Sequence, residues 1–360
     1  MVTQQVSLFA NTFMTDIGEN IYLKRLNSFQ SPQEHEYQYN CISLFSGGGG
    51  LDLGLSLAGF KSLVVSDVKE PFVSTIKHNL PHVNTHVGDA MDLSSSSLVN
   101  LAGNNDIDLM VAGPPCQSFS ILGKRKALDD PRGKLTVKYF ELIAEMRPKA
   151  FIFENVPGIL TVNQGQVWQD LLILIEETTE YSIHFQKLNS ANFGIPQIRE
   201  RVVLVGVRED IDDSTFVFPD YPTGLYSDLL SDSSPSKWAL ENVKGLPNHL
   251  IRQHGERVKN RYMKIPEGGR DTTDHTDRIN SIKPSGTVLV GSSAGGGRPH
   301  IHPFEPRVIT VREAARLQSF PDWYVFQGST TDQYRQVGNA VPPLLAYEVG
   351  IKIANILAHI

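Results

Sequence analysis

The chain has 360 residues, 40% of them hydrophobic and 20% charged, with two cysteines and a net charge of −6. These values are close to those of an ordinary globular protein, and the length allows one large domain or two moderate ones. Two cysteines exclude a disulfide framework, and no apolar run approaches the roughly 20 residues of a membrane helix. We therefore expect a protein of a reducing, cytoplasmic compartment that has no membrane contact.

The first 208 residues predict an extension followed by an α/β sheet. Residues 1–40 are polar and lack the basic start and apolar core of a signal peptide, so we interpret them as an N-terminal extension. From 41 to 208, short apolar runs alternate with helical stretches, as in βαβ units. The expected strands are 41–45, 63–66, 107–112, 150–153 and 201–207. The expected helices are near 51–57, 70–78, 137–145 and 167–177.

The character of the chain changes after Arg208. Residues 209–305 are rich in Pro, Gly, Ser and Asp, which predicts a loop-rich smaller domain over 209–332. Helix signals return at 310–318 and 343–357. The last helix is so apolar that we expect it to pack on the N-terminal sheet, giving a discontinuous large domain of 41–208 and 333–360.

Charge is distributed unevenly along the chain. Residues 244–307 contain 11 Lys and Arg against 6 Asp and Glu, a local charge of +5, which leaves −11 for the remainder. An acidic body with one basic segment fits a protein whose polyanion contacts are concentrated in one region. A solvated basic face is the alternative.

The turn Gly113-Pro114-Pro115-Cys116 follows an apolar run that predicts a buried strand of a parallel sheet. A thiol behind two prolines at a strand end lies on a stiffened turn, at the rim where open α/β sheets bind ligands. A packing cysteine is the alternative, because free Cys is a small and usually buried hydrophobe. The turn alone leaves both interpretations open.

A run of glycines, 47–50, separates the first expected strand from the first helix. Such a loop lets backbone N–H groups approach a ligand, but its spacing departs from G-x-G-x-x-G, which disfavours a pyrophosphate-binding dehydrogenase. Asp67 ends the next strand, where an acid can hold ribose hydroxyls, and Asp89 follows a short β-like segment, where it can accept from an adenine amino group. Helix capping or turn formation is the alternative for both acids.

Three charged residues stand at further strand ends. Glu154 directly follows the strand 150–153, and Arg199 and Arg201 lie at the edge of the strand 201–207. The alternatives are a Glu154 that faces solvent and, for one of the two arginines, a surface charge paired with Glu200.

In this order, five motifs resemble those of the DNA (cytosine-5) methyltransferases. They are Phe45-x-Gly47-Gly48-Gly49-Gly50, Pro114-Pro115-Cys116-Gln117, Glu154-Asn155-Val156, Gln197-x-Arg199-x-Arg201 and Gln336-Val337-Gly338-Asn339-Ala340-Val341-Pro342. The resemblance covers about residues 41–357, and 312–318 is also similar to the helix before the family's last motif. It implies a Rossmann-like methyltransferase sheet flanked by helices, a smaller target recognition domain, S-adenosylmethionine as co-substrate and no metal.

The resemblance also implies roles for single residues. The Cys116 thiolate would add to carbon 6 of cytosine, Glu154 would hold N3 and the exocyclic amine, and Arg201 would contact the base carbonyl, with Arg199 as second candidate. The implied cofactor residues are Phe45, Gly47, Gly49, Asp67, Val68, Asp89, Asn339 and Val341. Val68 stands where a bulky apolar or aromatic residue is common, and Ser43 replaces the usual acid at the end of the first strand.

The family likewise implies a target base flipped out of the duplex. The basic loop 118–133, which contains Lys124 and Arg125, would close over it. In the recognition region, about 220–305, Thr287-Val288 resembles a Thr-Leu element that supports the backbone near the flipped base. The glycines at 295–297 would allow close approach to DNA. The candidates for phosphate or guanine contacts are Arg252, Arg257, Lys259, Arg261, Arg270, Arg278 and Arg298.

The predicted function is methylation of carbon 5 of cytosine in a specific sequence of double-stranded DNA, by a bacterial-type, nucleoid-associated monomer. It would protect DNA from a cognate restriction endonuclease without touching that enzyme. Methylation of RNA such as tRNA is the alternative, which the sizeable basic recognition region disfavours. A non-catalytic nucleic-acid binding protein and, remotely, a cysteine hydrolase are the others, although no papain-like or caspase-like context surrounds Cys116.

Overall fold

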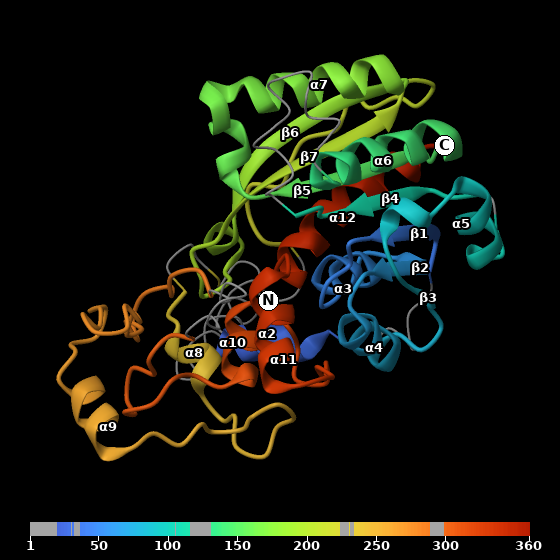
Figure 1. Ribbon diagram of the computed structural model, residues 1–360. Helices are drawn as coiled ribbons and strands as arrows, with labels where there is room; N and C mark the ends of the chain where they lie inside the picture. The colour runs from blue at the N-terminus through green and yellow to red at the C-terminus, as the bar shows by residue number, and fades with distance from the viewer. Residues whose placement is uncertain are drawn as a thin grey trace, which may run out of the picture.

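The computed structural model describes residues 20–29, 31, 37–104, 106–115, 131–223, 230, 234–288 and 299–360. Within them lies a seven-stranded sheet of order β3-β2-β1-β4-β5-β7-β6, with helices on both faces (Figure 1). The strands are β1 (Tyr39–Leu44), β2 (Phe60–Asp67), β3 (Asn84–Val87), β4 (Leu109–Ala112), β5 (Ala150–Asn155), β6 (Tyr181–Asn189) and β7 (Glu200–Arg208). The predicted α/β class is confirmed.

The direction of β7 is the feature of the sheet that matters most for the site. Strands β1 to β5 pair in parallel, whereas β7 pairs antiparallel with both β5 and β6. The first residues of β7 therefore lie at the rim where β5 ends, and Glu154 is opposite Val203. This direction, which the sequence did not predict, brings Arg201 to the same rim as Glu154.

Two helical layers cover the sheet, and alternate strand residues face one layer or the other. Cys41 and Val111 pack in the cluster that contains α3 (Gly50–Leu57) and α12 (Pro343–Leu357), whereas Ile42 and Met110 pack with the other layer. That other layer consists of α5 (Ser95–Ala102), α6 (Pro131–Met146) and α7 (Gln166–Thr178). Helix α4 (Glu70–Asn79) packs on β2 through Ile76 and Val65.

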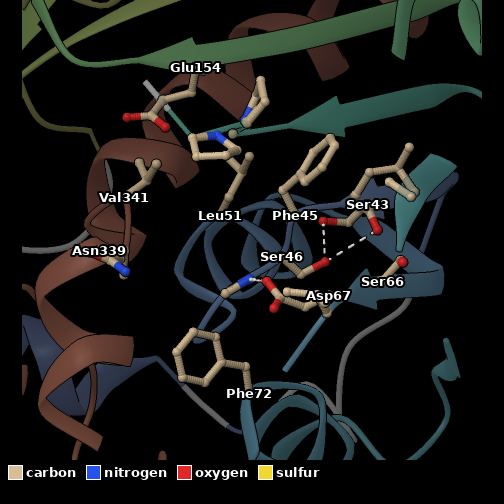
Figure 2. Close-up of a pocket in the computed structure, with 18 of the residues that line it drawn as sticks. Ser43, Phe45, Ser46, Leu51, Ser66, Asp67, Phe72, Glu154, Asn339 and Val341 are labelled. Carbon is tan, nitrogen blue, oxygen red and sulfur yellow. Dashed lines mark hydrogen bonds between the residues drawn. The ribbon is translucent and has the colours of Figure 1, made fainter. Parts of the chain in front are cut away.

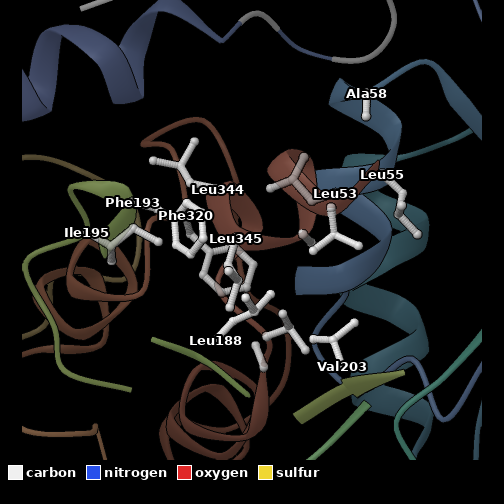
Figure 3. Close-up of a cluster of buried hydrophobic side chains, with 14 of the residues drawn as sticks. Leu53, Leu55, Ala58, Leu188, Phe193, Ile195, Val203, Phe320, Leu344 and Leu345 are labelled. Carbon is white, nitrogen blue, oxygen red and sulfur yellow. The ribbon is translucent and has the colours of Figure 1, made fainter. Parts of the chain in front are cut away.

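The C-terminal helix returns to the sheet, as its apolar sequence predicts. Leu344 and Leu345 of α12 lie among Leu53 of α3, Val203 of β7 and Phe320 (Figure 3). Leu53 and Leu344, which are 291 positions apart in the chain, thus share one core. The separation of this core from a smaller domain at 209–332 stays a prediction.

Between β7 and α12, the described residues form few regular elements, as expected. The helices described there are α8 (Lys237–Leu240), α9 (Glu256–Met263), α10 (Val311–Leu317) and α11 (Thr330–Asn339). Tyr262, Ile265, Ile301 and Val308 form a small core of their own, whereas α10 packs in the same cluster as α3 and α12. Thr310 and Glu313 begin α10 with a reciprocal capping box.

The N-terminal segment 20–29 is anchored in the molecule by α2 (Ile21–Ser28). Arg25 is fully buried and pairs with Glu348 of α12 at 2.7 Å, and Tyr22 donates to the carbonyl of Arg316.

None of the described helices is on its own both long and apolar enough to cross a membrane. Only the bent pair α11–α12 reaches that length and composition when its two helices are taken together.

Candidate active site

A pocket of about 600 Å³ opens at the carboxyl ends of β1, β2, β4 and β5 (Figure 2). Nine of the predicted site residues line it: Phe45, Gly47, Asp67, Val68, Asp89, Glu154, Arg201, Asn339 and Val341. Parallel strands present their carboxyl ends at one edge of a sheet, which is why residues so far apart in the chain meet here.

The glycine run shapes the wall of the pocket beside α3. Gly49 has a φ of 77°, and a Cβ there would lie 2.4 Å from the Tyr324 hydroxyl oxygen. A Cβ at Gly50 would lie 2.2 Å from the carbonyl oxygen of Val341. Gly49 does not line the pocket, contrary to the prediction. Gly49 lets the loop turn and Tyr324 approach, whereas Gly50 lets the segment around Val341 approach closely.

Asp67 is fixed at the end of β2 by backbone donors. Its two carboxylate oxygens accept from the N–H groups of Gly47 and Lys69, each at 2.9 Å. Burial raises the pKa of Asp67, and these backbone hydrogen bonds oppose the rise. Each oxygen can accept a further bond, so the carboxylate fits a vicinal pair of hydroxyls on a ligand.

Asp89 acts as a helix cap, one of its two interpretations, and lies at the pocket, where the contact with adenine stays a prediction. Its carboxylate accepts from the N–H of Met91 at 3.0 Å, which caps a short 3-10 helix, and the residue also lines the pocket.

Two aromatic rings contribute to the pocket, one of which the sequence analysis missed. Phe45 directly follows β1 and has a φ of 55°, a backbone conformation that a bulky residue rarely adopts. Phe72, from the first turn of α4, lies on the side of the pocket near Asp67 (Figure 2). Val68 is 67% exposed and covers little of this opening. The sequence signal that could have found Phe72 is an aromatic residue four positions after Val68, at the start of the expected helix 70–78.

Glu154 and Arg201 form an ion pair at the other end of the pocket. The distance from Glu154 Oε1 to Arg201 Nε is 2.8 Å, and both side chains are 11% exposed. Burial raises the pKa of Glu154, and the charges of Arg201 and Arg199 oppose this rise. The alternative of a solvent-facing glutamate is therefore wrong.

Arg199 lies behind the pocket instead of lining it. It is 1% exposed, and its Nη2 donates to the carbonyl of Gly338 at 2.8 Å. Burial and the charge of Arg201 both lower the pKa of its guanidinium. Glu200 pairs with Lys187 at 2.9 Å, so the expected pairing of an arginine side chain with Glu200 is also wrong.

The start of the cysteine turn is held beside Glu154. Asn155 Nδ2 donates to the carbonyl of Pro114 at 3.1 Å, and a Cβ at Gly113 would lie 3.0 Å from Glu154 Oε2. The described chain reaches Pro115, which lines the pocket. Cys116, Lys124, Arg125 and Arg298 lie outside the described residues, as do the glycines at 295–297.

The described basic candidates of the recognition region differ in their partners. Lys259 pairs with Glu256 at 2.9 Å, and Arg270 pairs with Asp277 at 3.6 Å. Arg261 pairs with Asp271 and Asp274, and Arg278 donates to the carbonyls of Ile265 and Pro303, so these two arginines stabilise the region itself. Arg252 and Arg257 are exposed and have no hydrogen bond or ion pair within the described chain. Among the described candidates, these two arginines are free to meet a polyanion.

Thr287 joins this region to the segment before β7. Its hydroxyl donates to the carbonyl of Ile198 at 2.9 Å, one residue before Arg199.

Comparison with known proteins gives a consistent result. Residues 39–355 match the family model of the C-5 cytosine-specific DNA methylases. The Type II methyltransferase M.XorII of Xanthomonas oryzae pv. oryzae is 33% identical, over 88% of this chain and 84% of the relative. The Type II methyltransferase M1.HphI of Haemophilus parahaemolyticus is 34% identical, over 86% of this chain and 84% of the relative.

Solved structures agree. A candidate DNA modification methyltransferase encoded within a prophage of Escherichia coli is 27% identical, with a TM-score of 0.72, over 89% of this chain and 100% of that one. The Dnmt2 methyltransferase of Schizosaccharomyces pombe is 18% identical, with a TM-score of 0.63, over 89% and 99%, a likeness of fold alone.

Proposed function

The chain belongs to the C-5 cytosine-specific DNA methylases, and from this premise we propose how its pocket and recognition region act on duplex DNA. It is a DNA cytosine-5 methyltransferase of restriction-modification type with S-adenosylmethionine as co-substrate. The observation that supports the proposal is one continuous pocket. The Asp67 carboxylate, held by backbone N–H groups, lies at one end, and the Glu154–Arg201 ion pair lies at the other.

The residues of the first end fit the co-substrate. Asp67 would accept from the ribose hydroxyls, because backbone donors already fix its two oxygens. Val68 and Phe72 would contact the adenine and Asp89 its amino group, whereas Phe45, Gly47, Asn339 and Val341 would line the rest of the site. When bound, S-adenosylmethionine supplies the methyl group.

The residues of the second end would bind the cytosine. Glu154 would hold N3 and the exocyclic amine, and the burial that raises its pKa favours the protonated form that can donate to N3. Arg201 is held against Glu154 and would contact the base carbonyl. A cytosine inside a duplex cannot reach this buried pair, so the base would flip out at a cost of about a few kcal/mol.

Cys116 would be the nucleophile. Its thiolate would add to carbon 6, and the ring electrons would then make carbon 5 nucleophilic enough to take the methyl group, with S-adenosylhomocysteine as the leaving group. Loss of the proton on carbon 5 to a base and elimination of the thiolate restore the aromatic ring and free Cys116. The Pro114-Pro115 turn beside Glu154 supports this placement, because it ends one residue before Cys116.

Arg252 and Arg257, with Lys124, Arg125 and Arg298, would contact the DNA, and Thr287 would support the backbone near the flipped base. In a bacterial cytoplasm, this methylation would protect the DNA from a cognate endonuclease that cleaves the same site when it is unmethylated. Both curated relatives described above are Type II methyltransferases, which supports DNA over RNA as the substrate.

Bisulfite sequencing of DNA from cells that express the chain tests the proposal. We expect 5-methylcytosine at one short sequence and none in cells that express Cys116→Ser, while the purified variant still binds duplex DNA. Substantial methylation by Cys116→Ser would refute the nucleophile. A trapped adduct with DNA that contains 5-fluorocytosine would exclude a non-catalytic binding protein.

A further inference from the structure

Two buried glutamines connect the recognition region to the pocket. Gln197 and Gln318 are both fully buried, and Gln197 Nε2 donates to Gln318 Oε1 at 3.0 Å. Gln197 lies just before β7, and Gln318 directly follows α10, 121 residues later.

Each glutamine also binds the backbone of a further segment. On the recognition side, the N–H of Val288 donates to Gln197 Oε1 at 2.8 Å. On the pocket side, Gln318 Nε2 donates to the carbonyl of Val337 at 2.8 Å, two residues before Asn339. A second amide hydrogen of Gln197 goes to the carbonyl of Leu317 at 3.0 Å.

The direction of these bonds is set by their ends. A backbone N–H can only donate and a backbone carbonyl can only accept, so neither amide can flip without losing a bond. Because both side chains are buried, no water can replace a lost partner, and an unpaired buried polar group is costly. The bonds therefore hold four segments in one relative arrangement. These are the segments around Gln197, Val288, Gln318 and Val337.

Arg199 stabilises the same contact between the recognition region and the segment that contains Asn339. Its guanidinium donates to the carbonyl of Gly338, which neighbours Asn339, while Thr287 donates to the carbonyl of Ile198. The segment 197–199 thus contacts the recognition region on one side and the Asn339 turn on the other.

We propose that Gln197 and Gln318 are positioning residues that couple binding of DNA at Thr287 to binding of S-adenosylmethionine beside Asn339. This inference rests on the proposed function. Ordering either segment restrains the other through the amide pair, so each ligand strengthens binding of the other by the same factor, as linkage requires.

The test measures that factor in the full chain with S-adenosylhomocysteine, which lacks the transferable methyl group. Its dissociation constant is measured with and without saturating duplex that carries the methylated site, and the duplex is titrated with and without S-adenosylhomocysteine. We expect the two ratios to be equal in the parent chain, within the range of about 5- to 150-fold that is common for coupled sites. In Gln318→Met, both ratios should fall towards one, while each ligand alone still binds.

Asn79→Leu is the matched control. Asn79 is a buried amide that also ties two distant segments, since it donates to the carbonyl of Val325 at 2.9 Å and accepts from its N–H at 2.8 Å. It contacts neither glutamine, so this variant should keep the parental ratio. A ratio that Gln318→Met leaves unchanged, or that both variants lower equally, would overturn the inference.

A second measurement needs no variant, in case Gln318→Met does not fold. Hydrogen exchange at the Val288 amide of the parent chain should slow when S-adenosylhomocysteine binds, although that pocket does not contain Val288. Unchanged exchange with the ligand bound would overturn the coupling. If neither ligand binds the parent chain, the proposed function fails first.

Discussion

At the scale of single residues, the site depends on a carboxyl group held between two opposing influences. Burial raises the pKa of Glu154, while Arg201 at 2.8 Å and the more distant Arg199 favour its ionised form. A group balanced in this way can share a proton with a base as charge develops on the ring, which is the property that general acid catalysis needs.

Glu154→Gln should therefore slow methyl transfer by about 10²- to 10⁴-fold, the usual contribution of a positioned acid or base. Binding of S-adenosylhomocysteine should stay nearly unchanged, because Glu154 lies at the opposite end of the pocket from Asp67. Single-turnover rates and a binding titration measure the two effects. Loss of cofactor binding would instead mean that Glu154 shapes the whole pocket.

Asp52 is a second buried carboxyl group, outside the pocket lining. It lies in the first turn of α3, and neither of its oxygens has a hydrogen-bond partner of normal geometry in the described chain. Burial raises its pKa to about 7, and the Ser43 hydroxyl close by opposes the rise. Asp52 is therefore partly protonated near neutral pH, and its ionisation disfavours the fold.

The stability of the parent chain relative to Asp52→Asn should depend on pH. Since the pKa is raised in the folded state, stability is fully present below the unfolded value near ~4 and is lost as pH rises towards 7. Between these limits, the difference in unfolding free energy should fall by at most about 1.4 kcal/mol per pH unit. Urea titrations from pH 4.5 to 8 measure it. A flat curve for Asp52→Asn would contradict the assignment.

At the scale of elements, the sequence predicted what apolar periodicity and strand ends reveal. Helix α12 and strands β4 and β5 came from continuous apolar runs, and Glu154 was found because it follows one of them. Strand β6 was missed because it is an edge strand with several exposed residues, and α11 because it is mostly polar. Periodicity cannot detect elements that bury so little apolar surface.

Helix α5 was missed for a different reason. Its serine-rich start resembles a loop, yet Ser94 and Ser97 form a capping box there. The roles of Gly49 and Arg199 could not be predicted either, since their partners Tyr324 and Gly338 lie far away in the chain.

The buried ion pair of α2 is the clearest element-scale test. Arg25 and Glu348 are each 1% exposed, so Arg25→Met leaves Glu348 buried without its cation and should lower the unfolding free energy by about 3–5 kcal/mol. Lys187→Met breaks the exposed pair with Glu200 and should change it by at most about 1 kcal/mol. Denaturant titration measures both. If both variants lowered the unfolding free energy equally, the buried pair of α2 would stabilise the fold no more than an exposed ion pair does.

At the scale of the whole molecule, the chain separates the chemistry from the choice of target. The pocket residues come from outside 220–305, whereas the net-positive segment 244–307 lies almost wholly within it. Some of the contacts that join the two parts are bonds between backbone groups, such as those of Ser285 with Pro196 and Ile198. Backbone contacts do not depend on the side chains that read DNA, so the recognition region can vary while the junction stays the same.

Exchange of residues 220–305 with the corresponding segment of M1.HphI, with residues 285–288 of this chain retained, should change the methylated sequence and leave carbon 5 of cytosine as the target. The retained segment preserves the bonds from Thr287 to Ile198 and from Val288 to Gln197, so the pocket keeps its geometry. Bisulfite sequencing of DNA from cells that express the chimera reports both properties at once. A control chimera exchanges only α7, which packs on the face of the sheet opposite α3 and α12. It should methylate the same DNA sequence as the parent chain. If the first chimera also kept it, sequence recognition would have to lie outside 220–305, in the chain that surrounds the pocket.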